Sequence, residues 1–234
     1  MDQRTSRSQR NFELTAPYEV LLPAAYEESG RYPLVVALHG MGQDEGVIRR
    51  DLAPLFDRPW IWLFPRGPYP LEIRGRHVMR IGYAWYMFDG DQTRLRQSMD
   101  ASCRHLLAII DTLWNTCRID LSKAAVLGFS QGGYLAGVLG ATNPMRFKAA
   151  CSIGGRIKHE FLTDAAAKAG PRVALAQIHG GRDESVKPQP ARDSIEAASK
   201  LGFTRAEYLE DPEAGHEITP RMVDWLGTWL ERVL

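Results

Sequence analysis

The chain carries the stretch Val126-Leu127-Gly128-Phe129-Ser130-Gln131-Gly132-Gly133, and this stretch decides the fold. It follows an apolar run and precedes the helix-forming run at residues 134–136. A G-x-S-x-G pattern between a strand and a helix is typical of a tight turn that holds the serine hydroxyl exposed at the end of a sheet. The same five-residue pattern also occurs in ordinary glycine-rich turns. The rest of the chain therefore has to decide whether Ser130 is a nucleophile.

Strand and helix patterns alternate on both sides of this turn. We expect one or two leading strands within residues 12–22, and further strands at 34–38, 60–64, 124–127, 148–153, 172–179 and 205–209. Helical patterns cover residues 45–56, 93–117, 131–142, 158–168, 191–201 and 220–233, the last with Thr219 as its cap. This alternation predicts an α/β fold with a mostly parallel central sheet, helices on both faces and no separate cap domain. We assign residues 12–234 to one domain and residues 1–11 to a flexible tail.

Composition excludes several classes of protein. The 234 residues are 44% hydrophobic and 24% charged, which is typical of a globular chain. A net charge of +1 gives no electrostatic reason to expect a nucleic-acid partner. No apolar run has the length of an integral membrane segment. The three cysteines are widely spaced and odd in number, so we expect free thiols and a cytoplasmic protein. The oligomeric state stays open.

Residues 66–91 fit neither the strand nor the helix period in this interpretation, and they are rich in aromatic side chains. Long connections of this kind in compact domains are usually functional. We expect the segment to cover the site at Ser130 on the side that would bind the acyl part of a substrate. Trp85 is the expected substrate-binding residue in its wall. The alternative is that its aromatic side chains pack on neighbouring helices, and whether the segment forms a mobile lid stays open.

A serine hydroxyl becomes a nucleophile when a neighbouring base takes its proton. In a fold of this kind the partners follow the serine in the order acid, then histidine. Of the six histidines, His39, His77 and His105 precede Ser130, while His159 and His179 leave no strand-end acid before them; this leaves His216 as the base. Asp183 directly follows a predicted strand and is the expected acid, with Glu184 as the fallback.

Acyl transfer also needs hydrogen-bond donors for the oxyanion of the tetrahedral intermediate. The turn supplies the backbone N–H of Gln131. The second donor is expected from the loop His39-Gly40-Met41-Gly42, where we choose the N–H of Met41, with Gly40 and Gly42 as open alternatives. His39 is interpreted as a hydrogen-bonding residue behind this loop. We expect no metal and no cofactor, because metal-ligand spacings and nucleotide-binding glycine motifs are missing from the sequence.

The chain resembles the phospholipase/carboxylesterase branch of the α/β-hydrolases, which includes acyl-protein thioesterase-like enzymes. The matching blocks are Leu38-His39-Gly40-Met41-Gly42, Gly128-Phe129-Ser130-Gln131-Gly132-Gly133, His179-Gly180 with Asp183, Val186 and Pro188, and Gly215-His216. The resemblance implies an α/β-hydrolase fold, the triad Ser130, Asp183 and His216, and an oxyanion hole at Met41 and Gln131. Trp85 resembles an aromatic residue near the family's acyl groove, although residues 65–91 are longer here.

These observations predict a cofactor-free carboxylesterase that acts on a small-molecule ester through an acyl-enzyme. Two alternatives stay open. The same machinery suits a thioesterase acting on acyl-thiols. A catalytically silent hydrolase-fold binding protein is a further alternative, against which the complete Ser-Asp-His set argues.

Overall fold

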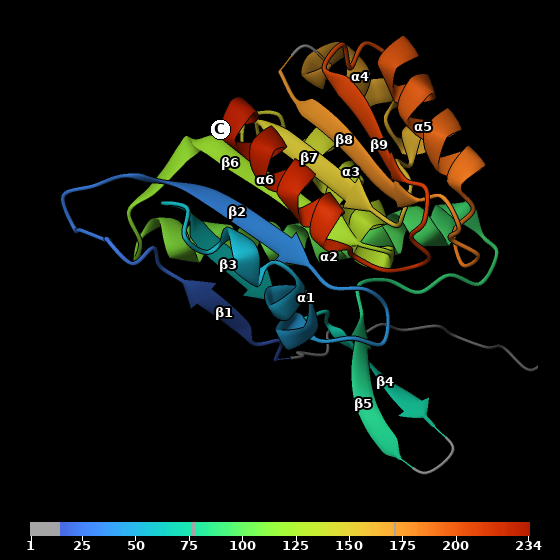
Figure 1. Cartoon of the computed structure of the whole chain (residues 1–234), viewed down its shortest axis with the longest axis horizontal. Helices are drawn as coiled ribbons and strands as arrows, with labels where there is room; N and C mark the ends of the chain where they lie inside the picture. The colour runs from blue at the N-terminus through green and yellow to red at the C-terminus, as the bar shows by residue number, and fades with distance from the viewer. Residues whose placement is uncertain (1–14, 76–77, 171) are drawn as a thin grey trace, which may run out of the picture.

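A computed structural model describes residues 15–75, 78–170 and 172–234. Its centre is a seven-stranded sheet in the order β1-β3-β2-β6-β7-β8-β9 (Figure 1). The edge strand β1 is antiparallel to β3, and every other pair in this sheet is parallel. The strands are β1 (Tyr18–Leu21), β2 (Tyr32–Leu38), β3 (Ile61–Pro65), β6 (Ile119–Phe129), β7 (Ala149–Ile153), β8 (Ala174–Gly180) and β9 (Ala206–Asp211). The predicted α/β fold with a mostly parallel sheet is confirmed.

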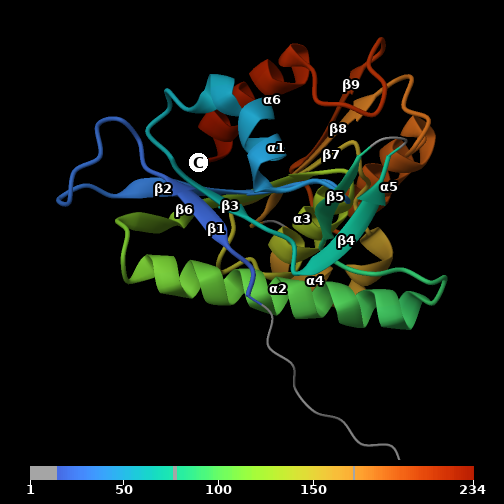
Figure 2. The same ribbon diagram turned by 90° about the horizontal axis from the view of Figure 1, so that it is seen from below.

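Helices cover both faces of the sheet (Figure 2). One face packs against α2 (Gln92–Trp114), α3 (Gln131–Thr142), α4 (Thr163–Ala169) and α5 (Pro188–Lys200). The opposite face packs against α1 (Glu45–Asp51) and α6 (Pro220–Val233). Because helices cover both faces, successive side chains of β2 and β3 are buried whichever face they lie on. This explains why the sequences of these strands are continuous apolar runs.

Local signals set several helix boundaries. Thr219 caps α6 by accepting a hydrogen bond from the N–H of Met222, as the sequence predicts. Gly202 follows α5 with φ 107°, a left-handed conformation that glycine adopts without strain. Other boundaries differ from the expectation. The predicted helix at 45–56 divides into α1 and a 3₁₀ turn at Ala53–Leu55, and the one at 158–168 into a 3₁₀ turn at His159–Phe161 and α4.

The expectation that residues 66–91 lack a strand period is wrong, because two strands of an antiparallel hairpin lie in this segment. Strands β4 (Tyr69–Arg74) and β5 (Met79–Ala84) pair with each other as a second sheet and project from the body of the molecule (Figure 1). Side chains in β4 alternate between half-buried and exposed positions. The strand period is therefore present, and Pro68 and Pro70 obscured it.

No helix in the described ranges is long and apolar enough to cross a membrane. The predicted tail, residues 1–11, and His77 lie outside the residues that the structure describes.

Candidate active site

Ser130 lies at the turn between the end of strand β6 and the start of helix α3. Its backbone has φ 50° and ψ −117°, and it is the one non-glycine residue with positive φ in the described part of the chain. A side chain at position 132 would collide with the carbonyl oxygens of Leu38 and His39, and one at position 128 would collide with the backbone of Gly132. The glycines of the G-x-S-x-G pattern therefore allow the close approach that holds this strained turn.

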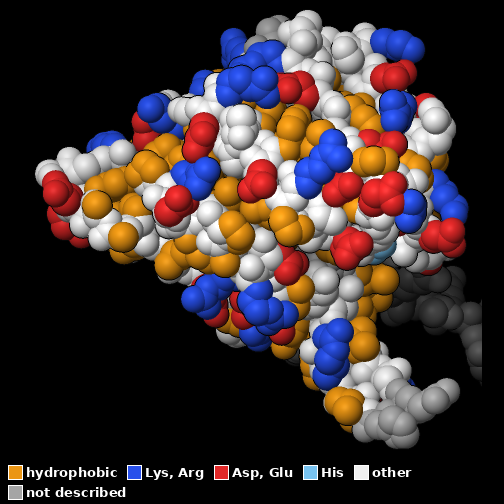
Figure 3. Space-filling model, in the orientation of Figure 1, with side chains coloured by type: hydrophobic (Ala, Val, Ile, Leu, Met, Phe, Trp, Pro, Cys, Tyr) orange, Lys and Arg blue, Asp and Glu red, His pale blue; other side chains and the backbone are white. Residues whose placement is uncertain are grey.

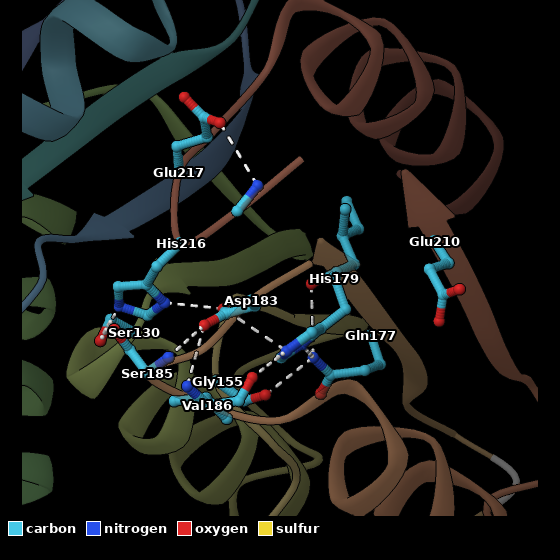
Figure 4. A network of polar contacts seen from close by, with 12 residues as sticks. Ser130, Gly155, Gln177, His179, Asp183, Ser185, Val186, Glu210, His216 and Glu217 are labelled. Atoms are coloured by element: carbon cyan, nitrogen blue, oxygen red, sulfur yellow. Dashed lines mark hydrogen bonds and ion pairs between the residues drawn. The ribbon is translucent and has the colours of Figure 1, made fainter. Parts of the chain in front are cut away.

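Three side chains form a continuous hydrogen-bonded chain at the carboxyl ends of the strands (Figure 4). The Oγ of Ser130 lies 3.0 Å from Nε2 of His216, and Nδ1 of His216 lies 2.7 Å from Oδ2 of Asp183. His216 comes from the loop between β9 and α6, and Asp183 from the loop after β8. The structure thus brings together the three residues that the sequence predicts as a triad. Glu184, the fallback acid, is exposed and outside this chain of contacts.

Asp183 is held by its own loop, with its side chain fully buried. Its Oδ1 accepts hydrogen bonds from the N–H groups of Ser185 and Val186, both at 2.9 Å. Its Oδ2 is left to receive the Nδ1–H of His216. The backbone donors on Oδ1 and the imidazole on Oδ2 hold the Asp183 carboxylate in one orientation. The same contacts fix the orientation of the His216 ring.

Sequence reasoning missed a support behind this aspartate. Nε2 of His179 lies 2.8 Å from the carbonyl oxygen of Val186, while its Nδ1 lies 3.3 Å from Nε2 of Gln177. Gln177 also donates to the carbonyl oxygen of Gly155, beside the site (Figure 4). These contacts assign the proton of a neutral His179 to Nε2, and they join the Asp183 loop to the loop after β7. The one signal for them was the occurrence of His179 in a family block.

Two backbone N–H groups near Ser130 are free to receive an oxyanion. In the loop after β2, the N–H of Gly40 donates to Oε1 of Gln43, and the N–H of Gly42 donates to the carbonyl of Tyr83. The N–H of Met41 has no acceptor among the described residues, nor does that of Gln131 at the start of α3. The geometry therefore favours Met41 over the alternatives Gly40 and Gly42.

His39 lies behind this loop and is fully buried. Its Nε2 accepts a hydrogen bond from the N–H of Gly67, so the proton is on Nδ1, which donates to the carbonyl of Gly40. Burial lowers the pKa of the His39 imidazole, in agreement with a neutral ring. This arrangement matches its predicted interpretation as a hydrogen-bonding residue that supports the loop.

Trp85 is fully buried and is not among the lining residues of the cavity described below, so its expected role as a substrate-binding wall stays a prediction. Its Nε1 donates to the carbonyl of His39 at 2.8 Å, and its ring packs on the His39 ring with 4.9 Å between centroids. Its backbone N–H donates to Oε1 of Gln131, whose Nε2 in turn donates to the carbonyl of Tyr86. Trp85 therefore holds together the two loops that carry the free N–H groups.

Comparison with known proteins places this arrangement in a family. A profile of the phospholipase/carboxylesterase family matches residues 25–234, which is most of the chain. The chain belongs to the phospholipase/carboxylesterase family. Its members are α/β-hydrolases that cleave carboxylic esters or thioesters, so the protein is a hydrolase of this kind. No curated protein sequence matches the chain.

Solved structures of similar fold cover nearly the whole of this family member. Esterase PE8 is 24% identical, with 95% of this chain and 100% of that chain covered and a TM-score of 0.75. Acyl-protein thioesterase 2 of Zea mays is 19% identical, with 93% and 99% covered and a TM-score of 0.72. The carboxylesterase of Bacillus cereus is 15% identical, with 94% and 95% covered and a TM-score of 0.68. These similarities show the α/β-hydrolase fold.

A cavity of about 240 Å³ lies near the site of this phospholipase/carboxylesterase family member, and neither Ser130 nor His216 is among its lining residues. Two aromatic residues of the segment 66–91 line it, Tyr86 and Phe88, so the segment contributes to a pocket through residues other than Trp85. The remaining lining residues are Gln92, Leu95, Met99, Tyr134, Arg156 and Lys158. Burial raises the pKa of the Tyr134 hydroxyl, which stays protonated at neutral pH.

Proposed function

We propose that the protein is a carboxylesterase-type serine hydrolase with Ser130, His216 and Asp183 as its catalytic triad. The observation that carries the proposal is the pair of contacts at His216, 3.0 Å to the Oγ of Ser130 and 2.7 Å to Oδ2 of Asp183. Such an imidazole accepts the serine proton through one nitrogen, while the carboxylate orients it through the other.

The reaction proceeds in two halves. Ser130 Oγ attacks the acyl carbon as its proton passes to Nε2 of His216, and the N–H groups of Met41 and Gln131 bind the resulting oxyanion. Nε2–H of His216 then protonates the departing alcohol, which leaves an acyl group on Ser130. Water, deprotonated by His216, attacks this acyl-enzyme and releases the carboxylic acid. The substrate is a small-molecule ester, and each step uses groups of the chain alone.

A thioesterase is the second candidate function. Solved structures similar to this chain include both esterases and an acyl-protein thioesterase, and the same triad serves either leaving group. Paired rates on oxygen and sulfur esters with the same acyl group separate the two functions.

For the location of the protein, the three free thiols of Cys103, Cys117 and Cys151 support a reducing compartment, and we propose the cytoplasm.

Replacement of the triad residues tests the proposal. Ser130→Ala and His216→Ala should each lower kcat on a short ester by about three orders of magnitude or more, and the double variant should lose little further activity, because the residues act as a unit. A fluorophosphonate probe should label the wild-type enzyme and not Ser130→Ala.

The control is Ser122→Ala, which removes an exposed hydroxyl near the start of β6 and should change neither activity nor labelling. Thermal unfolding of each variant shows whether the fold persists. Turnover near the wild-type rate in a folded His216→Ala variant would exclude His216 as the base, and absence of labelling in the wild type would support a silent binding protein instead.

A further inference from the structure

Two lining residues of the cavity near Ser130 are hydrogen-bonded to residues of the site. The N–H of Tyr134 donates to the carbonyl of Ser130 at 3.1 Å, and the carbonyl of Tyr86 accepts from the side chain of Gln131. At about 240 Å³ it is smaller than the pockets of roughly 300–1,000 Å³ that hold drug-sized ligands, so it suits a short acyl group.

Two cations line this cavity, Arg156 and Lys158, whereas none of its described lining residues is acidic. Both cations lie near a single carboxylate outside the lining, that of Glu160. Nη2 of Arg156 donates to Oε1 of Glu160 at 2.7 Å, and Nζ of Lys158 lies 3.5 Å from the same oxygen. The two cations at this cavity therefore share one nearby carboxylate.

Lys158 is unusual because its side chain is 6% exposed. An ammonium has three N–H donors, and the described partners of Nζ are Oε1 of Gln92 at 3.2 Å, the Glu160 carboxylate at 3.5 Å and the ring of Phe161, whose centroid is 4.7 Å away. Burial lowers the pKa of this ammonium, while Glu160 opposes the effect. Because Lys158 shares the Glu160 carboxylate with Arg156, an anion in the cavity would give both cations a further partner.

The cavity lies on the acyl side of the reaction. The departing alcohol has to receive its proton from Nε2 of His216, so it leaves beside that ring. None of the described residues that line the cavity belongs to the loop 212–219, which carries His216. The cavity is therefore away from the leaving-group side, which leaves it available to the acyl group on the other side of the scissile bond.

We propose that the cavity binds a short acyl chain that ends in a carboxylate, so that the enzyme prefers monoesters of dicarboxylic acids. The methylene groups contact the apolar walls at Tyr86, Leu95 and Met99, and the terminal carboxylate pairs with Arg156 and Lys158. Water hydrolyses the ester through the Ser130 acyl-enzyme and yields the free dicarboxylic acid and an alcohol. This inference rests on the proposed function and specifies its substrate class.

The test compares two substrates that differ in charge alone. Monomethyl glutarate carries the carboxylate, and the half-amide methyl ester of glutaric acid replaces it by a neutral carboxamide of the same size. The wild-type kcat/KM should be about tenfold or more higher for monomethyl glutarate, because hydrogen bonds to charged groups are the strong ones. Free glutarate should also inhibit hydrolysis of a neutral ester competitively.

Variants assign the preference to the two cations. Arg156→Gln and Lys158→Met should each lower kcat/KM for monomethyl glutarate by about tenfold and leave the half-amide ester within about threefold. Arg156→Lys should retain part of the preference, and glutarate should inhibit Arg156→Gln more weakly. Lys123→Gln is the matched control, since it removes an exposed cation from β6 away from the carboxyl ends of the strands. Arg156, with its side chain 23% exposed, keeps the test valid if Lys158→Met does not fold.

Equal rates on the two esters in the wild type, or an equal loss on both in Arg156→Gln, would overturn the inference and leave the proposed function standing. Failure of the proposed function has a different signature. The wild type would then hydrolyse neither ester, or hydrolysis would persist in Ser130→Ala.

Discussion

The hairpin formed by β4 and β5 has two parts that differ in burial. Its base, residues 80–86, contains Ala84 and Trp85, both fully buried. The described residues of its tip are Gly75, Val78 and Met79, and the last two are 67% and 64% exposed. Figure 3 shows hydrophobic side chains on the part of the surface where the hairpin projects from the body of the molecule.

The base is bonded to the loop that carries Met41. The N–H of Gly42 donates to the carbonyl of Tyr83 at 2.8 Å, and the N–H of Tyr83 donates to the carbonyl of Gln43 at 3.0 Å. Nη1 of Arg80 donates to the carbonyl of Gly42 at 2.7 Å. The base of the hairpin is thus hydrogen-bonded to the loop that carries Met41, and none of the described tip residues is. Substitutions in the base should therefore lower kcat, whereas substitutions in the tip should leave kcat unchanged.

Trp85→Ala should have the largest effect at the base. Loss of a buried tryptophan costs about 3–5 kcal/mol of unfolding free energy. Because Trp85 anchors the His39 loop, kcat should also fall, and by a similar factor for short and long acyl esters. Trp85→Phe keeps an aromatic ring, although a smaller one, and removes the hydrogen bond to the His39 carbonyl, so its loss of stability should be smaller than that of Trp85→Ala.

Thermal unfolding together with the acyl-length profile of kcat/KM checks this prediction. A change of about tenfold in the ratio of short-ester to long-ester rates would instead favour the pocket-wall role predicted from the sequence.

Gly82→Ala should reduce activity with a smaller cost in stability. A Cβ at position 82 would collide with the backbone of Gly42, so the loop that carries Met41 has to move. A displacement of about 1 Å at a catalytic group can lower the rate by as much as about a hundredfold. We expect kcat to fall by about tenfold or more on every ester.

Gly75→Ala is the matched control at the tip of the same hairpin, where the nearest described atom to the new Cβ is the carbonyl oxygen of Val78 at 3.3 Å. Measurement of kcat and of the melting temperature for both variants shows whether the base of the hairpin positions the loop that carries Met41. Equal activity in the two variants would show that the base does not position the oxyanion loop.

The contrast between base and tip also shows how far sequence reasoning reaches. The strained turn at Ser130 was predictable because glycine and serine at fixed spacing carry their own local constraint. The positions of Asp183 and His216 followed from chain order and strand ends, and the structure brings both to Ser130. Thr219 was predictable as a cap because the cap bond is local.

The role of Trp85 depended on contacts far along the chain. Its partners His39 and Gln131 are each 46 residues away, and no local pattern indicates such a contact. The cations of the cavity were missed for the same reason. Lys158 lay in a predicted helix, and only the tertiary structure turns it toward Gln92 and the site.

Replacement at the tip should have the smallest effect. Val78→Ser and Met79→Ser exchange exposed apolar side chains for polar ones, and surface substitutions of this kind usually change the unfolding free energy by less than about 0.5 kcal/mol. The tip makes no contact with the loop of Met41 among the described residues, so kcat/KM for short esters should stay within about twofold of the wild type. Measurements of the melting temperature and of kcat/KM for the double variant test both statements. A lower melting temperature would mean that the tip packs against the body of the protein. A loss of short-ester activity at unchanged stability would mean that the hairpin acts as one unit, and the distinction between its base and its tip would then fail.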